Sequence, residues 1–106
     1  MPKFMQQASY TASGSKGLLE KGGSARKAAV HEAVEQVGGT VECVYFAFGS
    51  DDLYSILELP DNASAAALSL AVTASGALTT KAVVLLTPEE IDAAVAKSVA
   101  FRPPGA

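Results

Sequence analysis

Residues 41–59, VECVYFAFGSDDLYSILEL, decide the fold of this chain. Two runs rich in β-branched and aromatic residues flank the Gly-Ser-Asp-Asp segment at 49–52, a pattern typical of two antiparallel strands joined by a tight turn. Both faces of both predicted strands are largely apolar. Because a chain of 106 residues supplies helices for only one face of a sheet, we expect the other face to meet a second subunit or a ligand.

Alternation along the two strands divides their side chains between two faces. With the turn at 49–52, Phe48 is predicted to pair with Leu53. The face assigned to the helices is the more hydrophobic and carries Val44, Phe46, Phe48, Leu53, Leu57 and Leu59. The opposite face adds two phenols, a thiol and a carboxylate, and carries Cys43, Tyr45, Ala47, Tyr54, Ile56 and Glu58. This second set suits either a flat interface between subunits or the wall of a shared ligand cavity.

The remainder of the chain predicts the element order β-α-β-β-α-β-α. In addition to the hairpin, the predicted elements are a strand at 3–10, a helix at 16–37, a helix at 62–74, a strand at 78–86 and a helix at 88–100. A polar loop is expected at 11–16, and Gly22-Gly23 is a soft spot in the first helix. Thr87, Pro88 and Glu90 form a strong helix start. The order favours an α+β, ferredoxin-like fold in one domain over residues 1–106, with an extra C-terminal helix.

Composition excludes several classes of partner. Hydrophobic residues make up 49% of the chain and charged residues 18%, against about 25% charged in an average domain, so covered surface is expected. The net charge is −3 and the basic residues are scattered, which excludes nucleic acid. The N-terminus lacks a signal-peptide core, and the apolar-leaning run 63–78 is too short to span a membrane. We therefore expect a soluble, cytoplasmic protein without a membrane partner.

Metal and disulfide chemistry are not expected. Cys43 is the single cysteine, which rules out an intrachain disulfide, and inside a strand it is typically a small buried hydrophobe. His31 is the single histidine and lies on the polar side of its predicted helix, far from Cys43. This spacing is not that of a zinc site. The sequence predicts neither a metal nor a cofactor.

A set of segments spread over nearly the whole chain points to a known family. The segments are GGSARK at 22–27, YFAFG at 45–49, LPDN at 59–62, ALSLAVTASGAL at 67–78, LLTPEE at 85–90 and FRPPGA at 101–106. Together they resemble the GYD-domain family, small bacterial proteins of the dimeric α/β-barrel type. The resemblance implies that two four-stranded sheets face each other across two subunits, and it implies no particular reaction. The Gly-Tyr-Asp motif that gives the family its name corresponds to residues 49–52. Gly49 and Asp52 match this motif, and Asp51 replaces the expected tyrosine.

Arg26 is the least expected charge in the chain. It lies at the centre of the apolar side of the predicted 16–37 helix. A buried guanidinium requires an anion or carbonyl oxygens, which Asp51, Asp52 or a bound carboxylate could supply. Alternatively, the aliphatic stem packs and the head reaches water at the helix end.

Other candidate residues lie on the predicted strands. Lys81 could pair with Glu58 or Asp52, or point to solvent. Arg26, Asp52 and Lys81 are therefore the candidate ligand-binding residues. Glu58 lies beside Tyr45 and Tyr54 on the second hairpin face, where desolvation would raise its pKa and make it a candidate general acid or base. At a sheet edge the same carboxylate would be solvated. Glu58, Tyr45 and Tyr54 are therefore the candidate catalytic residues.

The segment GLLEKGGS at 17–24 has the glycine spacing of a phosphate-binding loop. Gly23 stands where such a loop needs lysine, and no parallel β-α unit surrounds it. We interpret it as a helix kink that permits close packing on the alanine-rich second helix. A weak anion site at the Ser24 helix start remains an alternative.

Three functions are compatible with these features. The first is a homo-oligomeric small-molecule-binding or regulatory module for an apolar or carboxylate-bearing ligand. The second is a cofactor-independent oxygenase or isomerase acting on an apolar substrate in the barrel between subunits, by analogy with the wider barrel superfamily. The third is a purely structural oligomer.

Overall fold

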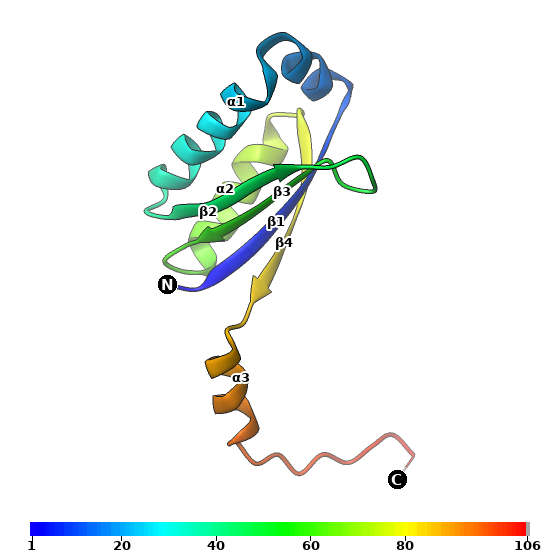
Figure 1. Cartoon of the computed structure of the whole chain (residues 1–106). Helices are drawn as coiled ribbons and strands as arrows, with labels where there is room; N and C mark the ends of the chain where they lie inside the picture. Colours follow the sequence, from blue (N-terminus) through cyan, green and yellow to red (C-terminus); the bar gives the residue numbers. More distant parts are fainter. Residues whose placement is uncertain (106) are drawn as a thin grey trace.

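The computed structural model describes residues 1–105, and its elements follow the predicted order (Figure 1). They are β1 (Lys3–Tyr10), α1 (Ala12–Gln36), β2 (Thr40–Phe46), β3 (Leu53–Glu58), α2 (Asn62–Ala74), β4 (Leu78–Leu85) and α3 (Pro88–Val95). The four strands form one antiparallel sheet in the order β2-β3-β1-β4. This is the ferredoxin-like α+β arrangement expected from the sequence.

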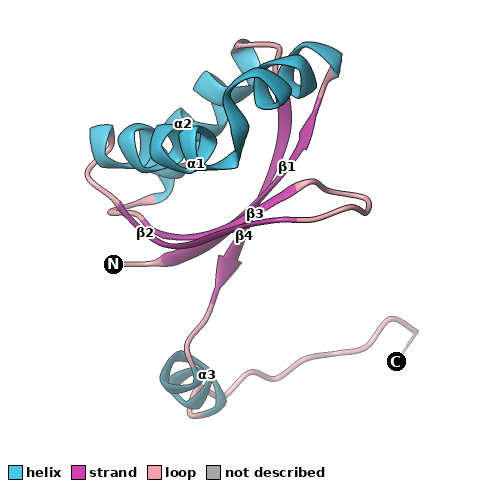
Figure 2. Ribbon diagram, turned by 45° about the horizontal axis from the view of Figure 1, so that its top comes forward, coloured by secondary structure: helices cyan, strands magenta, loops and turns pink. Residues whose placement is uncertain are grey.

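The two long helices, α1 and α2, cover the same face of the sheet, and α3 lies on the other side of it (Figure 2). The core between the sheet and the two helices comprises Phe4, Val34, Leu57, Leu59, Ala65 and Leu68. A smaller buried cluster contains Ala8, Leu53 and Leu78. Alternate residues of each strand point into these clusters, and the residues between them form an open face without helices.

The hairpin differs in register from the prediction. Phe46, not Phe48, pairs with Leu53, so the connection is residues 47–52 and not a four-residue turn. The cause is Asp52, whose backbone N–H donates to the Ala8 carbonyl of β1 at 2.8 Å and whose carbonyl accepts from the Ala47 N–H at 2.9 Å. These bonds hold Asp52 against the sheet and leave Phe48 fully exposed.

The division of the hairpin into two faces is nevertheless confirmed. Cys43 pairs with Ile56 and Tyr45 pairs with Tyr54, which places these four side chains on the open face. The register error is two residues, and side chains repeat their direction every two residues. The error therefore removes only Ala47 and Phe48 from their predicted faces.

Helix α1 begins earlier than predicted because Thr11 caps it. The Thr11 hydroxyl accepts a hydrogen bond from the Gly14 N–H at 3.4 Å, so residues 12–16 are helical and not a loop. The soft spot at Gly22 is confirmed, since its φ of 80° interrupts the helix. The packing explanation was wrong, because a β-carbon on Gly23 would lie 3.3 Å from the Phe46 ring of β2. Leu19, in the first segment of α1, is 87% exposed.

Helix α2 begins and ends where expected. The Asp61 carboxylate accepts from the Ser64 N–H at 2.8 Å and caps the helix. At α3, Thr87 and Glu90 form the predicted capping box. Helix α3 ends at Val95, short of the predicted Ala100, and has no buried residue.

Within residues 1–105, no helix combines the length and hydrophobicity needed to cross a membrane. The same residues contain no group of three or more histidine, cysteine, aspartate or glutamate side chains placed to hold a metal ion.

Candidate binding site between α1 and the sheet

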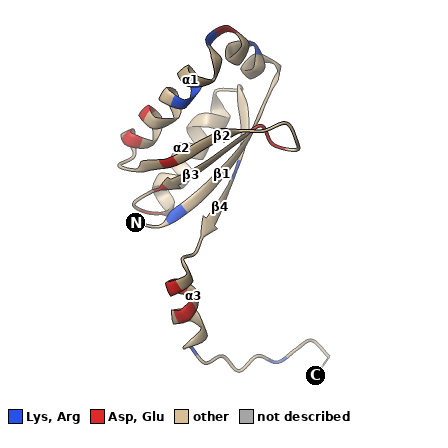
Figure 3. Cartoon of the chain, viewed as in Figure 1, with Lys and Arg blue, Asp and Glu red and all other residues tan. Residues whose placement is uncertain are grey.

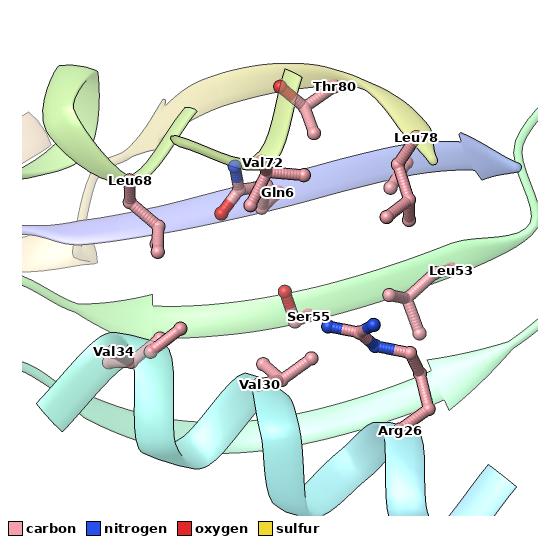
Figure 4. A pocket seen from close by; sticks show the side chains of 12 residues that line it. Gln6, Arg26, Val30, Val34, Leu53, Ser55, Leu68, Val72, Leu78 and Thr80 are labelled. Carbon is pink, nitrogen blue, oxygen red and sulfur yellow. The ribbon is translucent and has the colours of Figure 1, made fainter. Parts of the chain in front are cut away.

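The second segment of α1 places Arg26 over the sheet. The kink at Gly22 ends the first segment, and the Arg26 side chain then extends from α1 toward Ser55 of β3 (Figure 4). A cavity of about 50 Å³ lies here between both helices and the sheet. Its polar lining comes from Gln6, Arg26, Ser55 and Thr80, and the other lining residues are apolar. The helix-covered face therefore contains a small mixed cavity around one guanidinium.

Arg26 has no anionic partner in the part of the chain that the structure describes. Its Nε atom is buried without a hydrogen-bond acceptor, and none of the ion pairs found among residues 1–105 includes Arg26. Neither Asp51 nor Asp52, proposed as partners from the sequence, forms an ion pair with it. A buried donor without a partner costs about 1–3 kcal/mol, and more when it belongs to a charged group. The Arg26 guanidinium therefore has one buried donor without a partner, beside a cavity.

Tyr10 is a second unsatisfied group near Arg26. Its hydroxyl is buried and has no hydrogen-bond partner within residues 1–105. Burial raises the pKa of the Tyr10 phenol; the charge of Arg26 lowers this pKa and the charge of Asp52 raises it. A tyrosine phenol is ordinarily protonated at neutral pH and an upward shift of its pKa does not change this, so the hydroxyl is available as a hydrogen-bond donor.

A larger open groove connects these two residues. It has a volume of about 510 Å³ and lies under the first segment of α1. Its apolar lining includes Leu18, Ala25, Ala29 and Leu78, and its polar lining includes Tyr10, Arg26, Glu20 and Lys21. Arg26 also lines the 50 Å³ cavity, so the guanidinium lies between the cavity and the groove. The arrangement can bind a small anion at Arg26 and an apolar body in the groove.

Sequence reasoning identified Arg26 and missed the groups around it. Gln6, Ser55 and Tyr10 were not singled out, although alternation from the buried residues Phe4 and Ala8 places Gln6 and Tyr10 on the helix-covered face of β1. In the structure the Gln6 side chain donates to the Ser69 hydroxyl at 3.3 Å. Counting polar residues on the buried face of each strand would have found them.

Asp51, Asp52 and Lys81 form a separate polar cluster. The buried Asp51 carboxylate accepts a hydrogen bond from the Ser9 hydroxyl at 3.0 Å and lies 3.5 Å from the Lys81 ammonium. Asp52 accepts from the Tyr10 N–H at 3.0 Å. Lys81 therefore pairs with Asp51, and not with the expected Glu58 or Asp52.

This cluster attaches the 47–52 loop to the sheet. Lys81 pairs with Gln7 of β1, so it lies on the open face, opposite Arg26. Its side chain is 68% exposed, so solvent screens the ion pair strongly. Asp51, which replaces the tyrosine of the naming motif, is the only buried member of the ion pair and has become a structural anchor for the loop.

The candidate catalytic residues share the open face without forming a closed site in one chain. Tyr45 and Tyr54 are cross-strand neighbours, and Tyr45 is 69% exposed. Glu58 lies at the end of β3, where it accepts from the Thr40 hydroxyl at 3.4 Å and lies 3.8 Å from the Lys3 ammonium. Its side chain is 39% exposed, so within one chain this carboxylate is solvated and paired.

The family model described as GYD domain matches residues 4–95, from the second residue of β1 to the last residue of α3. No curated protein and no solved structure matches the chain.

Proposed function

The chain belongs to the GYD-domain family, and we propose that it is a homo-oligomeric small-molecule-binding module that holds a carboxylate-bearing ligand at Arg26. The observation that carries the proposal is the buried Arg26 Nε atom, which has no partner among residues 1–105 and lies beside a cavity. A ligand anion would supply the missing acceptor, because guanidinium groups bind carboxylates through two parallel hydrogen bonds.

The two spaces around Arg26 limit the size of the ligand. The cavity of about 50 Å³ exceeds the roughly 10–15 Å³ that one water needs, which is room for a carboxylate but not for a complete metabolite. The groove of about 510 Å³ falls within the range of small-molecule sites, roughly 300–1,000 Å³. In a ligand made of a compact ring or short hydrocarbon with one carboxylate, the carboxylate would fit the cavity and the apolar body would fit the groove.

The neighbouring residues would orient such a ligand. The Tyr10 phenol is a neutral donor without a partner among the described residues, so it would give the ligand a second hydrogen bond. Asp52 accepts from the Tyr10 N–H and so positions the end of β1. Apolar side chains such as Val30, Leu53 and Val72 line the cavity, exclude water and strengthen the ionic contact.

The homo-oligomeric part of the proposal rests on the open sheet face. Its apolar side chains include Met5, Cys43, Tyr54, Ile56 and Val83, and no helix of the described chain covers them. Two sheets of this kind pack face to face at about 10 Å in β-sandwiches. We propose that a second copy covers this face.

Titration with sodium benzoate tests the binding proposal. Benzoate is a compact carboxylate, and benzamide is its neutral counterpart of nearly the same shape. Isothermal titration calorimetry should detect benzoate and not benzamide. The Arg26→Gln variant should weaken benzoate binding at least tenfold, because it removes the charged fork.

The control is Lys27→Gln, which removes the same charge from the adjacent, exposed position. It should bind benzoate like the unchanged protein. Equal binding of benzoate and benzamide, or equal losses in both variants, would refute a specific anion site at Arg26.

A further inference from the structure

The last part of the chain, residues 86–105, projects away from the sheet and is called the C-terminal arm below (Figure 1). It contains α3, and every residue from 88 to 105 is exposed. The exposed fractions are 47% for Ile91, 79% for Val95, 81% for Val99 and 76% for Phe101. The backbone N–H groups of Ile91, Ala96 and Lys97 donate to carbonyl groups three or four residues earlier in the arm itself.

An arm of this kind is not stable by itself. Helix α3 has eight residues, and isolated helices shorter than about 12–15 residues are marginal in water. Ile91, Ala94 and Val95 form an apolar stripe with helical spacing, which normally packs against another element. The arm therefore requires a partner that one chain does not provide.

The dimensions of the chain give the amount of uncovered surface. Its accessible area is 7124 Å² at a mass of 10.8 kDa, whereas a compact monomer of this mass exposes about 5,500 Å². Its radius of gyration is 16.9 Å, against about 13 Å for a compact domain of this length. The excess of about 1,600 Å² exceeds the roughly 800 Å² that each partner buries in a standard interface.

A groove on the same chain has the shape and chemistry to receive the arm. It has a volume of about 390 Å³ and is lined by Tyr10, Leu18, Gly23, Phe46, Ala47 and Phe48, among others. Phe48 is fully exposed and Phe46 is 41% exposed, although both are large and apolar. Exposed aromatic groups beside a groove are typical of interaction surfaces.

The chain cannot fill this groove with its own arm. The groove adjoins Tyr10, which pairs with Leu78 at one end of β4, whereas the arm leaves from Leu85 at the other end. Two copies related by a two-fold axis perpendicular to the strands bring the arm end of one sheet to the groove end of the other. A second copy therefore supplies a groove for the unpartnered arm and an arm for the unfilled groove.

Charge is mixed on both surfaces. Helix α3 carries three acidic residues, whereas the first half of α1 carries Lys16 and Lys21 with Glu20 (Figure 3). The groove itself is lined by Asp52, and the arm also carries Lys97 and Arg102. The proposed contact therefore rests on apolar packing and not on charge.

We infer that the C-terminal arm of each copy docks, through Ile91, Val95 and Val99, into the Phe46–Phe48 groove of a second copy. Tyr10 and Leu18 line both this groove and the larger groove that reaches Arg26. The arm of one copy therefore contributes a wall to the binding site of the other.

Aspartate substitutions on the arm and in the groove test the contact in the full chain. Val95→Asp and Phe48→Asp should each weaken self-association at least tenfold in sedimentation velocity, since each places a charge in the buried contact. Ala93→Asp, on the opposite side of α3, and Ser50→Asp, in the same loop as Phe48, are the controls. Both should associate like the unchanged protein. All four positions are exposed in one chain, so the fold is retained.

Mixing the two defective variants gives the decisive measurement. A pair of one Val95→Asp chain and one Phe48→Asp chain retains one intact arm and one intact groove in contact. An equimolar mixture should therefore associate more strongly than either variant alone. A mixture no stronger than its components overturns the arm–groove contact, as does a monomeric unchanged protein at micromolar concentration or a Val95→Asp variant that associates normally. Benzoate binding is measured separately, so this result and that of the binding proposal are distinguishable.

Discussion

At the scale of single residues, the chain places most of its charges where water or an opposite charge can reach them. Lys3 lies 3.0 Å from Glu42, and the buried Asp51 faces Lys81 and Ser9. Arg26 differs, because its stem packs among core residues and its Nε atom has no partner in residues 1–105. Groups of this kind reduce stability and persist where binding requires them.

Replacement of Arg26 by methionine should therefore stabilise the ligand-free protein. Methionine keeps the packed stem and removes the unpartnered donor, whose burial costs about 1–3 kcal/mol. A gain of 1 kcal/mol corresponds to roughly 4–8 °C in melting temperature for a domain of this size. Lys27→Met, at the exposed neighbouring position, should change stability by less than about 0.5 kcal/mol. A lower melting temperature for Arg26→Met than for Lys27→Met in circular dichroism would contradict the prediction.

At the scale of elements, helix starts depend on caps that are visible in the sequence. Thr87 and Glu90 cap α3 as predicted, and Asp61 caps α2. Hydrogen bonds from the side chain and the backbone N–H of Ser64 lower the pKa of Asp61 from its ordinary value of 3.8. A pKa lowered by folding means that the charged cap stabilises the fold at pH values above 3.8. This contribution is lost as the pH falls from 3.8 through the lowered pKa.

Asp61→Asn isolates this pH dependence. The asparagine oxygen also accepts from the Ser64 N–H, so the variant should keep most of its stability at neutral pH. Because asparagine does not titrate, its melting temperature should fall less steeply between about pH 5 and pH 2 than that of the unchanged protein. Asp92→Asn, at an exposed position that caps no helix, is the control. Parallel pH curves for Asp61→Asn and the unchanged protein would exclude a contribution of the cap.

At the scale of the whole molecule, the sheet has one face covered by α1 and α2 and one face open (Figure 2). The projecting arm adds further uncovered apolar surface. Both features have the same physical cause, which is that a chain of 106 residues carries more apolar surface than its own elements can bury. Self-association through the open face is the proposal that accounts for the first feature.

Tyr54→Asp tests the open face. Tyr54 pairs with Tyr45 on β2 and with Gln7 on β1, so it lies in the middle of this face. A charge there should disrupt assembly, because burying an unpaired carboxylate between two sheets is costly. Light scattering should report a smaller particle than for the unchanged protein. Leu70→Asp, at a position on α2 that is 71% exposed, should leave the mass unchanged. An assembled Tyr54→Asp variant with an unchanged melting temperature would show that this face is not the interface.

The sequence by itself determined the element order, the capping box of α3 and the two faces of the hairpin. These depend on neighbouring residues, since capping acts over three positions and side-chain direction repeats every two. That repeat is why Tyr45 and Tyr54 were placed correctly although the register was wrong by two residues. Arg26 was recognisable because a charge interrupts an otherwise apolar helix side.

Only the tertiary structure decided which distant groups meet. The bond from the Asp52 N–H to the Ala8 carbonyl joins the 47–52 loop to β1, far away in the chain, and it sets the hairpin register. The pairing of Lys81 with Asp51, the approach of Tyr10 to Arg26 and the projection of α3 likewise depend on how β1 lies between β3 and β4. Local patterns do not specify such contacts, because their energies depend on which elements pack together.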